Sequence, residues 1–448
     1  MWEPVFMLLL AGGASAWAAI AYQRGRLLLW KSIASLCHLQ VEEISRATEL
    51  IVGMRARSGP LEMRIFPGQK RSASRILITI PGPPGFSGVR IRCEESVPLK
   101  TREIETGDES FDGRFVIEGP MRLVTVLLDA EMRQLLLRAS TEGKLELYQG
   151  ALKIEVSDED LARVMPLLLD IGRRLCEPVD AAQRLAENAG RDPNAAVRLR
   201  SLILLVREYP GEPGTVEALR AACADASPRV RLQAARELRA EGRDLLLELT
   251  ESEEDAVSAE AVLALRRELP FEHTRAVLDN ALRRRRLETA GACLEALGLG
   301  GEAAAVDVLA RVLAREKGEL AAAAALALGT TGSADAEPPL ILALQREPAS
   351  LRVAATNALA RVGTAAAVPA LKDAAGRFPR DPELQRATRQ AIAEIRSRLP
   401  GASPGQLSLA EAEVGQLSLA QAEAGQLSLA TDPAVPPVDS AALRSTIG

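Results

Sequence analysis

A short phrase rich in alanine and leucine returns along the second half of this chain with a nearly constant period. One leucine of each copy aligns with the next: Leu205, Leu238, Leu265, Leu297, Leu328 and Leu359. The successive gaps are 33, 27, 32, 31 and 31 residues. Such a period is typical of solenoids, in which each repeat buries its apolar face only against its neighbours.

Two further positions of each copy share a helical face with the leucine. Four residues earlier stands a small or modest side chain: Ser201, Ala234, Ala261, Cys293, Ala324 and Ala355. Eight residues earlier stand Val197, Val230, Val257, Thr289, Leu320 and Leu351. Spacings of four and eight place side chains on one face of a helix. Each such helix follows another amphipathic stretch, for example 216–224, 306–314 and 368–375, so each repeat is predicted to be a helical hairpin.

Residues 180–399 resemble HEAT-like repeats, in the short bacterial form known from bilin lyases. The resemblance rests on an Asp-x-x-Pro-x-Val-Arg turn before the second helix, present from Asp225 to Arg231. Its arginine recurs as Arg198 and Arg352. The resemblance implies an α-solenoid with a surface for a partner protein, and arginines that order the turns inside the array.

Glycines after the repeat helices, Gly298, Gly329 and Gly363, are expected to end those helices in the left-handed conformation. Some HEAT-like proteins are metal-dependent hydroxylases with paired His-Glu motifs. This chain has only the lone reversed pair Glu272-His273, so we predict no catalytic residue, metal ligand or cofactor. A net charge of −5 and 3% aromatic residues argue against nucleic acid as the partner.

The densest positive cluster is a candidate site for partner binding: Arg283, Arg284, Arg285 and Arg286. Guanidinium groups bind phosphate or carboxylate groups, so an acidic peptide is one ligand that such a cluster fits. The alternative is that the four side chains form a solvated hairpin end, offset by glutamates nearby. The sequence leaves both interpretations open.

The tail, residues 400–448, contains three copies of Gly-Gln-Leu-Ser-Leu-Ala, at 405–410, 415–420 and 425–430. Its low apolar content predicts disorder in isolation. The candidate partner-binding residues here are Leu407, Leu409, Leu417, Leu419, Leu427 and Leu429. Leu-Ser-Leu alternation would place both leucines on one side of a strand added to a partner. The alternative is a recently duplicated linker without function.

The N-terminus predicts a membrane anchor over residues 1–23. Eighteen residues without a charge, 5–22, would span about 27 Å as a helix, close to the thickness of a bilayer core. Arg24, Arg26 and Lys31 follow, so the rule that positive charges stay inside predicts a single-pass inner-membrane protein with its C-terminal bulk in the cytoplasm. The alternative is export after signal-peptide cleavage near residues 14–16.

Apolar residues continue at helical spacing after the anchor: Leu29, Ile33, Leu36, Ile44, Ala47 and Ile51. This spacing predicts a juxtamembrane helix over residues 24–58, and residues 27–51 are a candidate for self-association.

Residues 60–156 change to an alternating pattern and are predicted to form a small α+β domain. Strands are expected at 61–66, 75–80, 89–92 and 114–118, a helix at 123–139, and a hairpin around Gln149-Gly150. A connecting helix is expected within 157–179. The phrase over 105–117 resembles uncharacterised bacterial membrane-tethered domains. Asp108 and Asp112 in it are candidate catalytic carboxylates, or else residues that order a turn.

These features together predict a membrane-anchored scaffold whose solenoid binds a protein partner. The alternatives are an enzyme or small-ligand-binding protein with its site in the α+β domain, and a solenoid that binds nucleic acid. An enzyme would need a compact pocket with converging acidic and basic groups around 108–114, whereas a scaffold would show an extended groove.

Overall fold

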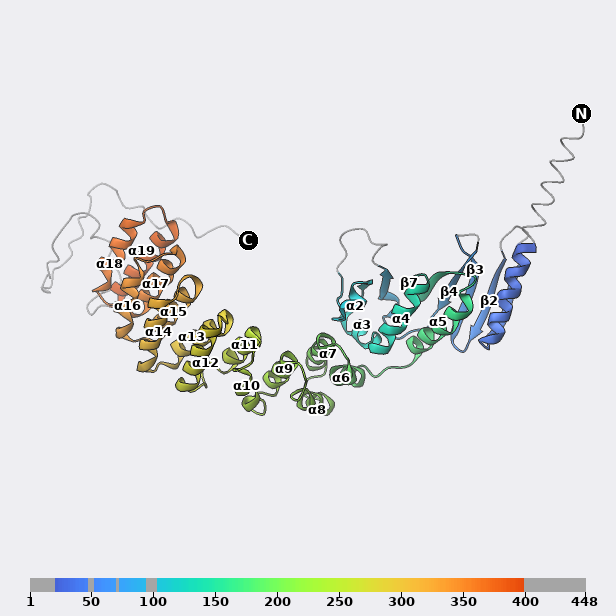
Figure 1. The fold of residues 1–448 in the computed structure, drawn as a ribbon, viewed down its shortest axis with the longest axis horizontal. Helices are drawn as coiled ribbons and strands as arrows, with labels where there is room; N and C mark the ends of the chain where they lie inside the picture. The colour runs from blue at the N-terminus through green and yellow to red at the C-terminus, as the bar shows by residue number, and fades with distance from the viewer. Residues whose placement is uncertain (1–20, 47–51, 70–71, 94–102, 399–448) are drawn as a thin grey trace, which may run out of the picture. The chain divides into compact units, whose positions relative to one another are not determined.

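The computed structural model describes residues 21–46, 52–69, 72–93 and 103–398 (Figure 1). Its N-terminal part is an eight-stranded antiparallel sheet with strand order β1-β2-β3-β4-β8-β7-β5-β6. The strands are β1 (Gln40–Arg46), β2 (Val52–Ser58), β3 (Leu61–Pro67), β4 (Ala73–Thr79), β5 (Arg90–Cys93), β6 (Phe115–Glu118), β7 (Lys144–Tyr148) and β8 (Ala151–Ser157). The predicted hairpin is confirmed, because β7 and β8 pair across Gln149 and Gly150, both with positive φ.

One face of this sheet is covered by helices. These are a helix over residues 21–36, the short helices η1 (Phe86–Gly88), α2 (Glu109–Asp112) and α3 (Met121–Leu127), and the longer α4 (Ala130–Glu142) and α5 (Leu161–Cys176). Alternate strand residues point to the covered face, so Ile76 of β4 and Ile154 of β8 meet Trp30, Leu136 and Leu168 in one core. The segment predicted to be a connecting helix therefore contains α5, which belongs to the core of the sheet domain.

The structure corrects the helix predicted over residues 24–58. The helix ends at residue 36, His38 adopts a left-handed conformation with φ 53°, and the chain continues as β1 and β2. Met54 and Ala56 of β2 are buried in the core to which α5 contributes, and β2 pairs with β3 in a hairpin that helical spacing does not predict. Ile33 lies in the domain core, and self-association through residues 27–51 stays a prediction.

Most of the predicted anchor, residues 1–20 of 1–23, lies outside the described residues, as does the alternative cleavage site at 14–16. In the part of the chain that the structure describes, no helix is both long enough and apolar enough to cross a membrane. We therefore correct the predicted localisation: a single-pass inner-membrane protein is not supported.

Residues 181–397 form seven successive helical pairs, drawn from green to orange in Figure 1. The pairs are α6 (Ala181–Arg191) with α7 (Ala195–Glu208), α8 (Pro213–Ala222) with α9 (Pro228–Leu238), α10 (Arg243–Leu249) with α11 (Asp255–Leu265), α12 (Phe271–Arg284) with α13 (Leu287–Gly300), α14 (Ala303–Arg315) with α15 (Gly318–Thr330), α16 (Glu337–Ala343) with α17 (Ala349–Val362), and α18 (Ala367–Arg377) with α19 (Pro382–Ser397). A short helix, η3 (Ala334–Ala336), precedes α16. The predicted solenoid of hairpins is confirmed.

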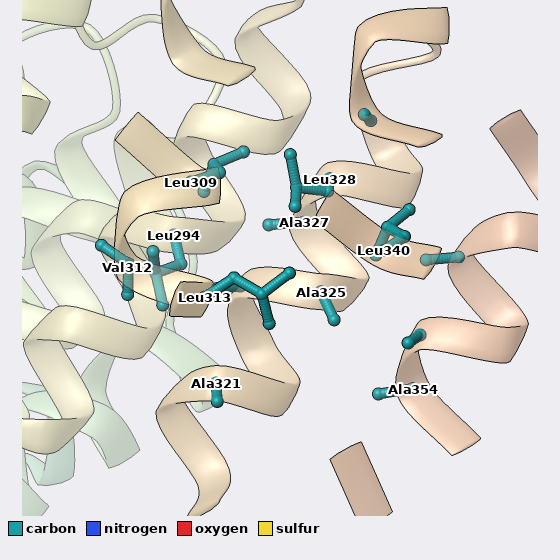
Figure 2. Packing of buried hydrophobic residues seen from close by; sticks show 14 of the residues in the cluster. Leu294, Leu309, Val312, Leu313, Ala321, Ala325, Ala327, Leu328, Leu340 and Ala354 are labelled. Carbon is teal, nitrogen blue, oxygen red and sulfur yellow. The ribbon is translucent and has the colours of Figure 1, made fainter. Parts of the chain in front are cut away.

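The aligned small residues form the buried seam between second helices. All six have a relative exposure of 0%: Ser201, Ala234, Ala261, Cys293, Ala324 and Ala355. Consecutive second helices α11, α13, α15 and α17 contact one another. In Figure 2, Ala325 of α15 lies between Leu313 of α14 and Ala354 of α17. The period of the sequence is therefore the period of contact between second helices.

The expected role of the repeat glycines is wrong. Gly298 and Gly329 lie within the right-handed helices α13 and α15, and Gly363 has φ −67°. A Cβ atom added to Gly329 would lie 2.7 Å from the Cα atom of Ala358, and one added to Gly298 would lie 2.7 Å from the carbonyl oxygen of Ala327. These two glycines therefore permit close approach between neighbouring second helices rather than ending a helix.

Candidate protein-interaction surface

The carboxylates considered as catalytic groups order the backbone around α2. Asp108 caps α2 and accepts hydrogen bonds from Ser110 Oγ at 2.6 Å and Arg133 Nε at 2.9 Å. Asp112 accepts from the backbone N–H groups of Thr106 and Gly107, each at 2.8 Å. Burial alone would raise the pKa of Asp108, but the hydrogen bonds from Ser110 and Arg133 outweigh it and lower that pKa. This geometry is that of an ordered turn.

Arg133 links the sheet domain to the first helical pair. Its side chain is 1% exposed, and its two Nη atoms each lie 3.0 Å from a carboxylate oxygen of Asp192, in the loop between α6 and α7. Nη1 also donates to the carbonyl oxygen of Leu128 at 2.9 Å. Asn188 of α6 adds a hydrogen bond to the carbonyl oxygen of Thr125. Buried charges need such complete pairing. This contact therefore holds α4 of the sheet domain against the loop between α6 and α7.

The repeat arginines order the turns in the way the sequence predicts. Nη1 of Arg198 donates to the carbonyl oxygen of Asp192 at 2.9 Å, and Nη1 of Arg231 donates to that of Asp225 at 2.9 Å. Arg352 makes the equivalent bond six residues back, at 3.2 Å. Arg198 also pairs with the Asp225 carboxylate of the next repeat through Nε at 2.7 Å and Nη2 at 2.8 Å. These arginines are therefore part of the array's internal structure.

The four consecutive arginines do not act as one cluster. Arg286 is buried and donates to the carbonyl oxygen of Ser252, and Arg284 forms an ion pair with Glu253. Arg285 ends α12 in the left-handed conformation, with φ 59°, and both it and Arg283 are exposed. Only part of the predicted cluster is available to a partner.

Arg285 lines a hollow of about 810 Å³ between the N-terminal parts of α13 and α15. Its apolar lining comes from Leu287 and Gly291 of α13 and from Leu320 and Ala323 of α15. Its charged lining is Arg285, Arg315, Glu316, Lys317 and Glu319. Among the ion pairs of the described residues, none involves the three cations of this hollow.

The surface changes character at this hollow. Before it, exposed Arg–Glu pairs join neighbouring repeats, namely Arg229–Glu254 at 3.2 Å, Arg236–Glu260 at 2.8 Å and Arg266–Glu295 at 3.5 Å. At the hollow, α13 and α15 expose Leu287 (53%), Leu299 (38%) and Leu326 (47%), and Leu287 belongs to the lining of the hollow itself. An exposed leucine beside an apolar hollow marks an interaction site more often than a scattered one does. Sequence reasoning missed this site.

A second hollow, of about 850 Å³, lies on the uncovered face of the sheet. Its charged side chains largely pair with one another: Arg75 with Glu155 at 3.3 Å and Lys153 with Glu146 at 3.6 Å. Mutual pairing leaves little charge for a ligand, so the hollow between α13 and α15 is the stronger candidate surface.

Two other predicted features stand apart from that surface. The tail leucines, from Leu407 to Leu429, lie outside the described residues. Nε2 of His273 lies 2.8 Å from Oγ1 of Thr250, which is a contact within the array. No group of three or more His, Cys, Asp or Glu side chains that could hold a metal ion occurs among the residues that the structure describes.

Comparison with known proteins supports the repeats. Residues 311–393 match the family model described as HEAT repeats. The helical pairs within this range are therefore HEAT-like, whereas nothing found supports the resemblance of residues 60–156 to membrane-tethered domains. No curated protein matches the chain in sequence.

Solved structures of low identity match about half of the chain. The human deoxyhypusine hydroxylase in complex with glycerol is 18% identical, with 48% of this chain and 95% of that chain covered and a TM-score of 0.21. The complex of CpcE and CpcF of phycocyanin lyase from Nostoc sp. PCC7120 is 19% identical, with 50% of this chain and 96% of that chain covered and a TM-score of 0.30. An engineered protein is 22% identical, with 48% of this chain and 89% of that chain covered and a TM-score of 0.22.

Proposed function

We propose that this protein is an interaction scaffold, whose HEAT-like solenoid binds a partner protein at the surface between α13 and α15. The observation that carries the proposal is the hollow of about 810 Å³, with three cations that form no ion pair among the described residues and an exposed leucine at its edge. Interfaces typically place apolar side chains at the centre and polar ones at the rim, and this surface has that composition. A scaffold needs no catalytic residue, and the prediction that this chain is not an enzyme stays a prediction.

The tail is proposed as a second binding segment, through the leucines of its three repeats. Three copies would raise the effective concentration of a weakly binding motif. This segment would act separately from the solenoid surface, so the two can be tested together.

Affinity capture with the full chain tests the proposal, compared with a chain that ends at Leu399 and with an unrelated bait of similar size. If the solenoid binds the partner, both forms retain the same protein at comparable yield. Loss of capture on truncation would assign binding to the tail. Capture by neither form, above the unrelated bait, would contradict a scaffold function.

A further inference from the structure

We propose that the hollow between α13 and α15 binds a leucine-bearing segment of a partner protein with acidic residues at one end. This inference rests on the proposed scaffold function and adds the chemistry of the partner. It is carried by the apolar floor, by cations at one end that form no ion pair in the described part of the chain, and by Leu326, which continues the floor along α15.

The floor of the hollow can accept an aliphatic side chain. Leu287, Leu320 and Ala323 line it, and Gly291 presents no side chain at all. A Cβ atom added to Gly291 would meet no atom within 4 Å, so this glycine serves no packing contact inside the array. Glycine within a helix costs about 1 kcal/mol relative to alanine. The open space above Gly291 is where an incoming side chain fits.

The apolar surface continues from the hollow along α15. Leu326 lies three residues after Ala323, so helical spacing keeps these two side chains on one face. On α13 the exposed Glu295, which pairs with Arg266 at 3.5 Å, separates Gly291 from Leu299. From residue 317 to residue 326 the axis of α15 advances about 14 Å. A partner segment of about ten helical residues, with leucines every three or four positions, would match this length.

The charge at one end selects an acidic segment. Arg285, Arg315 and Lys317 line the hollow without forming an ion pair in the described part of the chain, against the carboxylates of Glu316 and Glu319. Guanidinium and ammonium groups at a binding rim favour carboxylates on the partner and exclude like charges. The interspersed glutamates and the lack of aromatic side chains in the lining disfavour a nucleic acid.

Gly291 offers a substitution that fills the hollow without disturbing the fold. Gly291→Glu places a side chain in open space and adds a negative charge beside the floor. Gly376→Glu in α18 is the matched control, because a Cβ atom there also meets nothing within 4 Å. Lys317→Glu, at an exposed position of the rim, tests the charge separately. Circular dichroism of each full-length variant verifies that the fold is retained.

The probe is a fluorescein-labelled synthetic peptide, Glu-Glu-Glu-Leu-Ala-Ala-Leu-Ala-Ala-Leu-Ala-Ser, titrated with the full-length protein and followed by fluorescence anisotropy. We expect saturable binding, a loss of about tenfold or more with Gly291→Glu and with Lys317→Glu, and a change below about twofold with Gly376→Glu. A peptide with lysines in place of glutamates and one with serines in place of leucines should each bind at least about tenfold more weakly.

Several outcomes would overturn the inference: no saturable binding by the unsubstituted protein, equal affinity for the lysine peptide, unchanged affinity in Gly291→Glu, or tighter binding of a twelve-nucleotide single-stranded DNA. If the peptide titration fails but the full chain still captures a partner, only the inference of an acidic, leucine-bearing segment is overturned. Failure of both experiments would remove the scaffold function as well.

Discussion

Asp225 shows how a single carboxylate connects two repeats. It accepts two hydrogen bonds from Arg198 of the preceding repeat and one from the backbone N–H of Ser227 at 2.7 Å, while its own carbonyl oxygen accepts from Arg231. Burial would raise the pKa of Asp225, but the hydrogen bonds from Arg198 and Ser227 outweigh it and lower that pKa. The ionised form is therefore favoured more in the folded protein than in the unfolded chain.

This lowered pKa predicts loss of stability in acid. A group whose pKa is lower in the folded state stabilises the protein above its unfolded pKa, which is near 3.8 for aspartate, and that contribution disappears as the pH falls below this value. We expect the free energy of unfolding to fall from about pH 5 to about pH 3, and Asp225→Asn to be less stable at about pH 6 with a shallower fall in acid. Urea denaturation at each pH measures both.

Asp170→Asn is the control for that experiment, because the Asp170 side chain is 57% exposed and its one ion pair among the described residues is with Arg173 at 3.3 Å. It should keep the pH dependence of the unsubstituted protein. If the free energy of unfolding of Asp225→Asn falls as steeply in acid as that of the unsubstituted protein, the role given to this carboxylate is contradicted.

Several residue roles could be predicted from the sequence because they repeat. The arginine at the turn recurs at one position of the repeat, so its internal role followed from Arg198, Arg231 and Arg352 together. The partner of Arg133 does not recur and lies 59 residues away along the chain, so no periodic signal indicated its contact with Asp192.

At the scale of the helices, close approach between second helices depends on glycine. Gly329→Ala would place a methyl group 2.7 Å from the Cα atom of Ala358 in α17, so the two helices must separate. We expect the substitution to lower the free energy of unfolding by about 1–3 kcal/mol, although alanine favours helix more than glycine does. Chemical denaturation of the two proteins measures the difference.

Gly190→Ala in α6 is the matched control, since an added Cβ atom there meets nothing within 4 Å. Its helix propensity should instead raise the free energy of unfolding by about 0.5–1 kcal/mol. If Gly329→Ala instead raised the free energy of unfolding, the packing of α15 on α17 would not depend on this close approach.

The elements could be predicted where packing is local and could not where it is distant. The hairpins of the array pack on their sequence neighbours, so their spacing in the sequence is the spacing of their contacts. The helical spacing of Leu29 and Ile33 continues into Ile44, yet β1 and β2 are strands, because Met54 and Ala56 of β2 join a core to which the distant helix α5 contributes. Burial against a distant element has no signature in the local pattern.

For the molecule as a whole, the contact between Arg133 and Asp192 predicts that the sheet domain stabilises the first repeats. Arg133→Met would leave the buried Asp192 carboxylate without its partner, which costs about 3–5 kcal/mol. We expect amide hydrogen exchange to accelerate in α6 and α7 more than in α15 and α17, because repeats contact only their neighbours.

Arg163→Ala is the control at this scale, because the Arg163 side chain is 65% exposed and its pairs with Glu142 and Asp160 lie at the surface. Surface pairs contribute about 0–1 kcal/mol, so exchange in α6 and α7 should stay near that of the unsubstituted protein. Uniform acceleration across all helices in Arg133→Met would instead indicate one cooperative unit.

The candidate surface was visible in the sequence only in fragments. Four consecutive arginines drew attention to residues 283–286, yet the helix end at Arg285 separates their side chains, and Arg286 is buried. The residues that complete the hollow, Leu287, Gly291 and Lys317, come from neighbouring repeats and meet only after the array has folded.

The seam of fully buried small residues carries a consequence for how such a chain changes over generations. Since each hairpin meets only the one before and the one after it, a whole unit of about 31 residues can be gained or lost by recombination, with one new junction to accommodate. The shortened unit around α10 and α11 already departs from that length. Length is thus a variable trait of this architecture, and the site between α13 and α15 could move intact to a longer or shorter relative.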